Sequence, residues 1–173
     1  MRSLALAVAV GFALAGCASM QGAGGSAGAD LKTPAGKSVG MATLTPVSGG
    51  IRIVIEAKDL PPGAHAVHIH AVGKCDAPDF MTSGGHFNPG NKQHGSMNPQ
   101  GPHAGDLPNM SVDGIGAGRL ETITDRISLD AGPNSVFDAD GSAIVIHAAS
   151  DDFRTDPTGN AGGRIACGVI VKK

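Results

Sequence analysis

The seven histidines are the residues of this chain whose types and spacing point most directly to chemistry. His68 and His70 flank Ile69 within an apolar run. On a β-strand, residues two apart project to the same face, so both imidazoles would lie side by side while Val67 and Ile69 face the core. Paired imidazoles are suitable ligands for copper or zinc. An isolated His-x-His pair is more often a solvated surface feature, so the remaining histidines decide between the two interpretations.

A second set of candidate ligands lies in segment 73–108, which is rich in Gly and Pro and has no regular apolar spacing. A compact domain rarely contains so long a segment without secondary structure unless it is functional or held by additional bonds. The alternative is a polar loop whose histidines are incidental, but that interpretation leaves the length of the segment unexplained. Three imidazoles and one carboxylate suit a tetrahedral zinc site; they belong to His86, His94, His103 and Asp106.

Two histidines stand apart from these sets. His147 ends an apolar run, where a lone histidine is commonly a hydrogen-bonded core residue. It becomes a ligand candidate only because three other candidate ligands need a fourth to complete a metal site. His65 has the strand parity of Val67 and should point away from His68 and His70. We expect His65 to hydrogen bond to the backbone at the end of a barrel and not to bind a metal.

The elements that would position these histidines are short strands, because helical periodicity is hard to find in the chain. Strand-like runs separated by Gly, Pro and Asn are typical of an all-β sandwich or barrel. The predicted strands cover residues 38–47, 51–57, 64–72, 117–124, 126–129, 142–148 and 164–172.

The first residues are typical of an export signal. A short basic start precedes an apolar run that ends near Ala15 and is too short to span a membrane. Leu14-Ala-Gly-Cys17 resembles the lipobox of bacterial lipoproteins, which predicts a signal peptide over 1–16 and a lipid on Cys17. Ordinary secretion with loss of Cys17 is the alternative. Residues 17–36 are rich in Ala, Gly and Ser and are expected to form a flexible tether, so the folded domain is expected over 37–173.

The remaining two cysteines and the net charge of the chain indicate which classes of protein are compatible with the sequence. Cys75 and Cys167 form an even pair, which in an exported protein suggests a disulfide; two free buried thiols are the alternative. The 13 Lys and Arg residues less Arg2 leave 12, against 15 Asp and Glu. Because the chain also lacks Trp, Tyr and any basic run, we expect no binding of nucleic acid.

Taken together, these motifs resemble those of copper/zinc superoxide dismutases, in the order found in that family and over about residues 38–172. The segments that carry the resemblance are HAVHIH at 65–70, GGHFNP at 84–89, HG at 94–95, HAGDLPN at 103–109, VIH at 145–147, DD at 151–152 and GNAGGRIACGVI at 159–170. Each motif alone would be weak, whereas the ordered set is specific.

The resemblance implies an eight-stranded Greek-key β-barrel, related to the immunoglobulin-like sandwich, with long metal-binding loops and one copper and one zinc per subunit. It implies copper ligands at His68, His70, His86 and His147, and zinc ligands at His86, His94, His103 and Asp106, with His86 bridging the metals as an imidazolate. It also implies a disulfide between Cys75 and Cys167, an Asp151 carboxylate that links His68 to His94, and Arg164 above the copper.

The implied activity is the dismutation of superoxide to oxygen and hydrogen peroxide, with Arg164 attracting the anion and His86 delivering a proton. A non-catalytic copper/zinc-binding protein on the same scaffold is the alternative, but such a protein has no need of Arg164. Without the motifs, Arg164 would be interpreted as a surface charge and Asp151 as a loop cap. The segment 151–164 is short and lacks the charged cluster that guides substrate in some eukaryotic members.

The predicted location follows from the amino-terminal motif. Lipid on Cys17 would anchor the enzyme to a membrane with its domain in the periplasm. Ala18 follows the cysteine, in place of the aspartate that often retains bacterial lipoproteins in the inner membrane, so the outer membrane is expected. Bacterial members of the family include monomers and dimers, so a homodimer is compatible with the resemblance.

Overall fold

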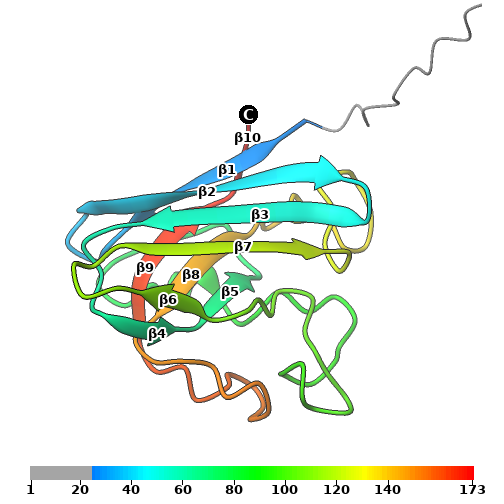
Figure 1. Ribbon diagram of the computed structural model, residues 1–173. Coiled ribbons are helices and arrows are strands. Elements are labelled where there is room, and N and C mark those ends of the chain that lie inside the picture. Colours follow the sequence, from blue (N-terminus) through cyan, green and yellow to red (C-terminus); the bar gives the residue numbers. More distant parts are fainter. Residues whose placement is uncertain (1–24) are drawn as a thin grey trace, which may run out of the picture.

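Antiparallel β-strands make up nearly all the regular structure of this protein, which the computed structural model describes over residues 25–173 (Figure 1). The strands are β1 (Ala27–Lys32), β2 (Ser38–Val47), β3 (Gly50–Ala57), β4 (Gly63–His65), β5 (Val67–His70), β6 (Met110–Val112), β7 (Gly118–Thr124), β8 (Ala143–His147), β9 (Arg164–Val169) and β10 (Val171–Lys172). One short 3-10 helix, η1, spans Met81–Ser83.

The strands form one sheet that curls into a nearly closed barrel. Its order is β4-β6-β7-β3-β2-β1-β9-β8-β5, and β10 pairs with β1. Because Ala66 alone separates β4 from β5, the two ends of the sheet meet. The connection from β3 to β4 bypasses β7 and β6, a Greek-key crossing. Counting β4 with β5 and β9 with β10 as interrupted strands gives eight, which confirms the predicted all-β barrel.

Alternation of apolar and polar residues explains where the core lies. In β3, Ile53 and Ile55 are fully buried, whereas Arg52 and Glu56 point outward. Leu44 of β2 is also fully buried. The inward faces of the strands therefore supply one continuous core inside the barrel, which gives the strands that carry the histidines a rigid support.

The predicted tether over 17–36 is wrong for its second half, because Ala27–Lys32 forms β1 between β2 and β9. Ala27, Ala29 and Leu31 are at most 2% exposed. The strand was missed because alanines carry little hydrophobic signal and alternate with Gly28, Asp30 and Lys32 in a composition typical of a linker. The folded domain therefore begins near Ala27 and not at residue 37.

The predicted strand at 126–129 is also wrong. Both edges of β7 are occupied, by β3 and β6, so no edge remains for that segment to pair with. It contributes only an isolated bridge between Ser128 and Ser135. The predicted strand at 64–72 is interrupted at Ala66 and ends at His70. The three-residue strand β6 was not predicted, because it is too short to show a pattern.

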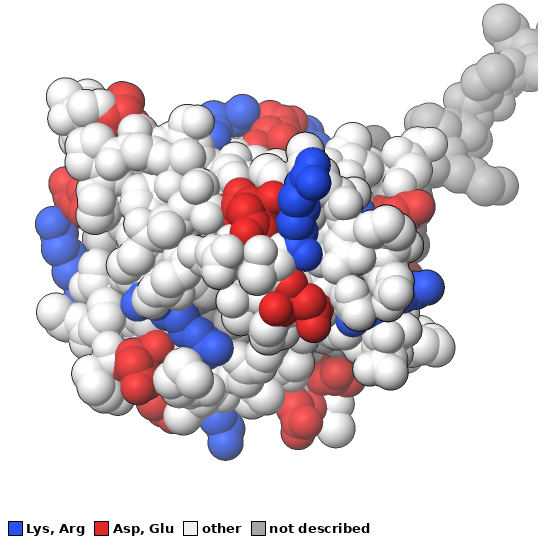
Figure 2. All heavy atoms as spheres, turned by 90° about the horizontal axis from the view of Figure 1, so that it is seen from below, with Lys and Arg blue, Asp and Glu red and all other residues white. Residues whose placement is uncertain are grey.

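Two long loops extend from the same side of the barrel, one between β5 and β6 and one between β8 and β9 (Figure 1). The first is bonded to the backbone of β5: Ile69 N donates to Gly105 O at 2.9 Å, and Phe87 N donates to Ile69 O at 2.8 Å. Gly105 lies so close to Ile69 O that a side chain there would clash. The surface that carries these loops shows acidic and basic groups interspersed, with no broad area of one sign (Figure 2).

The predicted signal peptide, Cys17 and residues 18–24 of the tether lie outside the described residues. Within residues 25–173, no helix has the length and apolar character needed to cross a bilayer.

The placement of β1 yields a prediction for stability. Leu31→Ala should lower the free energy of unfolding by about 2–5 kcal/mol, because it leaves a cavity against the core. The exposed neighbour provides the control: Asp30→Ala should change it by about 0.5 kcal/mol or less. Urea unfolding of both variants measures the difference, and equal stability would mean that this segment is a tether after all.

Candidate metal centre

His68 and His70 project from the outer face of β5, as strand parity predicts. Both are essentially buried, at 0% and 1% exposure, because the long loop covers this face. The register with β8 places them opposite Val145 and Ala143, respectively. Val67 and Ile69 point into the barrel core, so one four-residue strand anchors the fold on one side and presents two imidazoles on the other.

His65 lies apart from the cluster, as expected. Its Nδ1 contacts His147 O at 2.7 Å and its Nε2 contacts Pro61 O at 2.8 Å. Both ring nitrogens are therefore used in backbone contacts, and neither faces the other imidazoles. His65 positions the end of β8 and takes no part in a metal group.

Four histidines from three parts of the chain converge beside β5. One ring nitrogen each of His68, His70, His86 and His147 lies within 4.8 Å of the others. The Nε2 atoms of His70 and His147 are 3.3 Å apart. Within residues 25–173, His68 Nδ1 and His86 Nε2 are buried and have no hydrogen-bond partner. Buried polar atoms are rarely left unsatisfied, so two orphaned nitrogens in one cluster fit a metal ion held between them.

In His70 and His147, the ring nitrogen that faces away from the cluster contacts a backbone oxygen. His70 Nδ1 contacts Gly84 O at 2.9 Å, and His147 Nδ1 contacts Gly162 O at 3.3 Å. A neutral imidazole that donates from one nitrogen has a lone pair on the other. The backbone contacts therefore orient the Nε2 lone pairs of both rings toward the common centre, as the outer hydrogen bonds of metal-binding histidines do.

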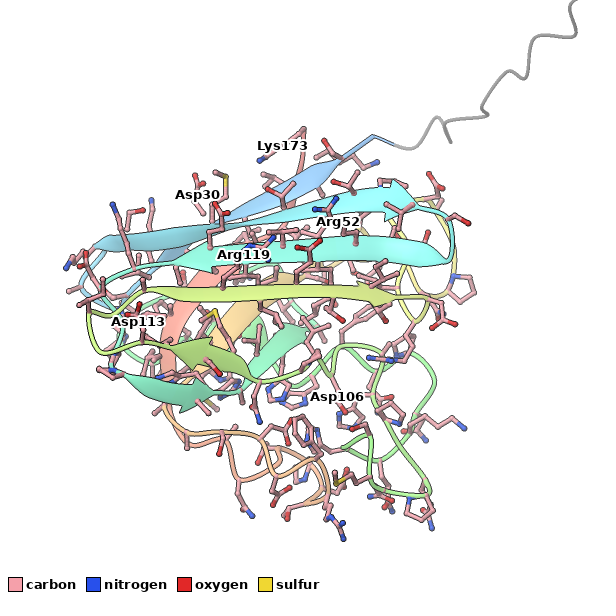
Figure 3. The ribbon with its side chains drawn as sticks, viewed as in Figure 1. Asp30, Arg52, Asp106, Asp113, Arg119 and Lys173 are labelled. Atoms are coloured by element: carbon pink, nitrogen blue, oxygen red, sulfur yellow. A yellow bond between two sulfur atoms is a disulfide. The ribbon has the colours of Figure 1, made fainter. Side chains whose placement is uncertain are left out.

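A second group surrounds the Asp106 carboxylate, which lies on the long loop below the barrel (Figure 3). Asp106 Oδ1 is 3.0 Å from His86 Nδ1, 3.1 Å from His94 Nδ1 and 3.3 Å from His103 Nδ1. Tetrahedral zinc with ligands at about 2.0–2.1 Å requires ligand atoms roughly 3.3 Å apart. The four side chains thus have nearly the spacing of a tetrahedral zinc site, and His86 belongs to both groups through its two nitrogens.

Both His68 and His103 lie close to this group. One ring nitrogen of His68 is within 4.8 Å of ligand atoms of His86, His94 and Asp106. His103 is the better placed of the two, because its Nδ1 lies 3.3 Å from both His86 Nδ1 and Asp106 Oδ1. His68 Nε2 is engaged with Asp151 at 2.8 Å, and its Nδ1 belongs to the first group.

Asp151 connects the two groups. Its Oδ2 accepts from His68 Nε2 at 2.8 Å and its Oδ1 from His94 Nε2 at 2.9 Å, which are the two partners that the family resemblance implies. Asn109 fixes the backbone of Asp151 with two hydrogen bonds of 3.0 and 2.8 Å. Both nitrogens of His94 thereby contact carboxylates, Asp106 on one side and Asp151 on the other.

The charges of the cluster follow from burial and from these carboxylates. Burial lowers the pKa of His70 to about 2, of His86 to about 4 and of His147 to about 3, so all three are neutral and have lone pairs available for a metal. Burial also acts to lower the pKa of His94, but the bonds to Asp106 and Asp151 outweigh it and raise the pKa to about 9. The histidine contacts hold the pKa of Asp106 well below its usual range despite its burial.

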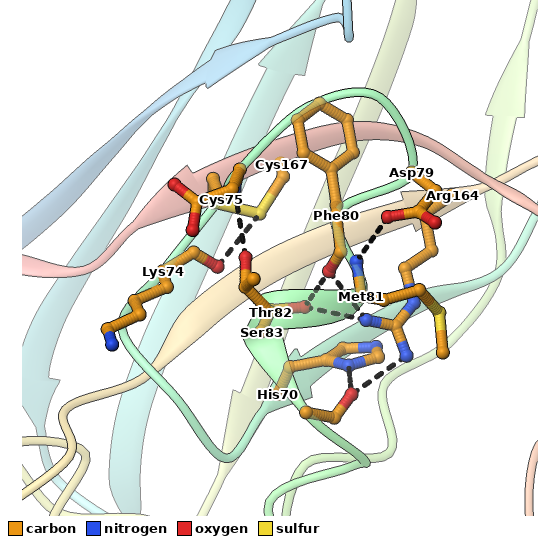
Figure 4. Close-up of a disulfide and its surroundings, with 12 residues drawn as sticks. His70, Lys74, Cys75, Asp79, Phe80, Met81, Thr82, Ser83, Arg164 and Cys167 are labelled. Carbon is orange, nitrogen blue, oxygen red and sulfur yellow. Dashed lines mark hydrogen bonds between the residues drawn. A yellow bond between two sulfur atoms is a disulfide. The ribbon is translucent and has the colours of Figure 1, made fainter.

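Arg164 lies at the mouth of the first group, in a cleft of about 920 Å³ whose lining also includes His70, His86 and His147. Its guanidinium donates to Phe80 O at 2.7 Å, Ser83 Oγ at 2.9 Å and Gly84 O at 2.8 Å (Figure 4). Gly84 O also accepts from His70, so Arg164 and the imidazole cluster share one anchor.

The predicted disulfide is confirmed: Cys75 is bonded to Cys167 (Figure 4). It ties the segment that carries η1 to β9, 92 residues away in the sequence. A loop of that length corresponds to about 4–5 kcal/mol in chain-entropy estimates. Because η1 and its flanking residues supply the oxygens that hold Arg164, the disulfide also fixes the arginine in the cleft.

The sequence does not predict some of the supporting residues. Asn109 falls within the HAGDLPN motif, but only the structure shows that it bonds to the Asp151 backbone. Asp156 accepts from His94 N at 2.6 Å. Gly159 adopts a φ of +64° and lies where any side chain would clash with Asp151 and His94. A glycine followed by Asn-Ala-Gly indicates a turn, but only the folded structure shows that this turn packs on a carboxylate.

Comparison with known proteins agrees with this geometry. The model of the family "Copper/zinc superoxide dismutase (SODC)" matches residues 38–170. "Superoxide dismutase [Cu-Zn] 1" of Aquifex aeolicus is 49% identical over 144 residues, which cover 82% of this chain and 85% of that protein.

Two solved structures show the same fold. A SOD-like protein from Bacillus subtilis has a TM-score of 0.80 at 41% identity, covering 83% of this chain and 97% of that one. Cu/Zn superoxide dismutase from Brucella abortus has a TM-score of 0.67 at 26% identity, covering 83% of this chain and 98% of that one. The chain therefore belongs to the copper/zinc superoxide dismutase family.

Proposed function

We propose that this protein dismutates superoxide in the Arg164 cleft, with copper held by His68, His70, His86 and His147 and zinc held by His86, His94, His103 and Asp106. The observation that carries the proposal is the position of His86. Its Nδ1 faces the Asp106 group, while its Nε2 is buried, has no hydrogen-bond partner among the described residues and is turned toward the other three imidazoles. One side chain therefore supplies a donor to each of two metal sites.

When bound, copper supplies one-electron redox chemistry and zinc, which has none, supplies fixed charge. The overall reaction converts two superoxide anions and two protons into one oxygen and one hydrogen peroxide. The protein residues must therefore admit a small anion, exclude larger ligands and deliver protons.

Arg164 is placed to admit the anion. Its guanidinium is held by three neutral oxygen acceptors and by no carboxylate of the described residues, so none of these cancels its positive charge by direct pairing. An arginine retains its charge at every working pH. Because it is half-buried at the cleft, the charge acts through a medium less polar than bulk water.

His86 is placed to move a proton. It lines the cleft, and in the part of the chain that the structure describes its Nε2 has no hydrogen-bond partner that would compete for the proton. Burial lowers the pKa of His86 to about 4, so its ring holds a second proton only weakly. Asp106 fixes the ring from the other side through Nδ1.

A non-catalytic copper/zinc-binding protein is the second candidate. One relative of similar fold is named only a SOD-like protein, so similarity alone does not distinguish the two functions. This chain has Arg164 in addition to the ligand groups. Arg164 lines the cleft, and within the described residues its hydrogen bonds go to Phe80, Ser83 and Gly84 and to none of the metal-group side chains. A storage protein does not require that charge.

The two metal groups can be separated by mutation. His147→Ala should abolish dismutase activity and copper retention while zinc remains, because His147 belongs to the first group alone. Asp106→Ala should lose zinc and loosen the long loop, with copper retained and activity reduced. Metal content by elemental analysis and the dismutation rate, measured on the same samples, test this. If both variants lost the same metal, the assignment of the groups would be wrong.

The role of Arg164 predicts a salt-dependent loss of rate. Arg164→Gln should reduce the second-order rate constant about tenfold at low ionic strength without loss of metal, and the deficit should shrink as salt screens the charge. Arg119→Gln, which removes an equal charge from the exposed surface of β7, should have little effect. An unchanged rate for Arg164→Gln at low ionic strength would refute the role.

We further propose that the protein is a lipoprotein of the outer membrane, anchored at Cys17 with the domain in the periplasm. Leu14-Ala-Gly-Cys17 and the following Ala18 support this proposal. Superoxide is an anion and crosses a bilayer poorly, so an enzyme in the envelope would intercept it outside the cytoplasm. Stable anchoring needs more than one acyl chain, and the lipobox cysteine of bacterial lipoproteins normally carries two or three.

Cys17→Ser should release the protein into the soluble fraction or stall signal removal, while the fold and both metals are unchanged. Fractionation of the envelope and mass spectrometry of the mature amino terminus measure this. A soluble wild-type protein that begins after Cys17 would replace the lipoprotein interpretation with simple secretion.

A further inference from the structure

The two long loops, one between β5 and β6 and one between β8 and β9, are bonded to each other next to the proposed zinc group. This group consists of His86, His94, His103 and Asp106. Met97 N, on the first loop, donates to Phe153 O, on the second, at 2.9 Å. Gly95 lies so close to Phe153 O that a side chain there would clash. The segment that begins at His94 is therefore fixed against the β8–β9 loop.

Asp156 supplies a carboxylate to this junction. Its Oδ1 accepts a hydrogen bond from His94 N at 2.6 Å. The same oxygen lies 3.8 Å from His103 Nε2, which is too far for a hydrogen bond but close enough for its charge to act on the ring. One oxygen of the β8–β9 loop therefore faces two residues of the zinc group.

The ring nitrogens that face away from the zinc position show why this oxygen matters. In metal-binding histidines, that nitrogen usually donates to a carboxylate, a carbonyl or water. His94 Nε2 contacts Asp151 at 2.9 Å, and His86 Nε2 belongs to the copper group. For His103, apart from the carboxylate that faces its Nδ1, Asp156 has the only carboxylate within 4.0 Å among the described residues.

The charge of Asp156 favours the tautomer of His103 that zinc requires. A neutral imidazole carries a proton on one nitrogen and a lone pair on the other. A carboxylate beside Nε2 stabilises the proton at Nε2, which leaves the lone pair on Nδ1. Nδ1 is the nitrogen that lies 3.3 Å from both His86 Nδ1 and Asp106 Oδ1.

We propose that Asp156 is a positioning residue of the zinc group: it holds the backbone of His94, selects the tautomer of His103, and thereby raises the affinity of the group for zinc. The inference rests on the zinc site of the proposed function. Outer partners of metal-binding histidines typically contribute about 10–100-fold to metal affinity. Because the Asp156 side chain is 45% exposed, its charge is partly screened by solvent, and we expect the charge alone to contribute less than that.

Two substitutions separate the two contacts. Asp156→Asn removes the charge beside His103 but keeps an oxygen that can accept from His94 N. Asp156→Ala removes both. Asp130→Asn is the matched control for net charge, because Asp130 is exposed and its hydrogen bonds within residues 25–173 are made by its backbone.

Asp156→Asn should weaken zinc binding about threefold, and Asp156→Ala about tenfold or more. Copper affinity should be unchanged, because within the described residues Asp156 contacts neither His70 nor His147. Competition with a chelator of known affinity measures the dissociation constants of both metals. Asp130→Asn should match the wild-type protein in both.

A second measurement separates the orientation of His103 from a general role in folding. In the copper(I)- and zinc-loaded protein, the proton on His103 Nε2 is observed by nuclear magnetic resonance. Asp156→Asn should move this resonance upfield and speed the exchange of the proton with water, because the neighbouring negative charge is lost. The free energy of unfolding of the metal-free protein should change little.

The outcomes are distinguishable. If Asp156→Asn keeps the wild-type zinc affinity, the inference is overturned. Weaker zinc binding with an unmoved His103 resonance, or with an equal loss of copper, would also overturn it, because a general loosening of the loops would then explain the effect. If the loaded wild-type protein does not dismutate superoxide while the Asp156 variants still weaken zinc selectively, the proposed function fails and the role of Asp156 stands.

Discussion

The constraint on which the rest of this structure depends is that His86 must present one ring nitrogen to each of two donor groups. His86 lies on a long loop, which by itself could not fix the position of the imidazole relative to the two donor groups to within about an ångström. Rigidity comes from the backbone bonds that join Ile69 to Phe87 and to Gly105 and from the disulfide at Cys75. The contacts of Arg164 with Ser83 and Gly84 add to it. The apolar core matters for function because it makes β5 an immobile reference for this loop.

Charge compensation is the second consequence of placing two donor groups side by side. Asp106 and Asp151 are nearly buried, and isolated carboxylates in such surroundings would be costly. His94 lies between them and contacts both, which is why its pKa rises while those of His70 and His147, without carboxylate partners, fall. This chain thus combines a basic imidazole with neutral ones in one cluster, and zinc bound at His94 Nδ1 would take the place of the proton that the two carboxylates stabilise.

Much of this arrangement could be predicted from the sequence, because it depends on local periodicity and on residue types. Parity alone separated His65 from His68 and His70. What could not be predicted depends on tertiary contacts: β1 is a strand because β2 and β9 flank its small residues, and segment 126–129 is not one because β7 has no free edge. The supports from Asn109, Asp156 and Gly159 likewise come from segments that meet only after folding.

The central claim, that His86 is shared between two metals, is tested most directly by magnetic coupling. Copper(II) alone in the protein should give an ordinary electron paramagnetic resonance signal, and adding cobalt(II) in place of zinc should strongly reduce it, because an imidazole bound through both nitrogens couples the two spins. His86→Ala loaded with both ions should keep the full copper signal. A copper signal unchanged by cobalt in the wild-type protein, with both ions shown to be bound, would contradict the shared ligand and with it this account of the site.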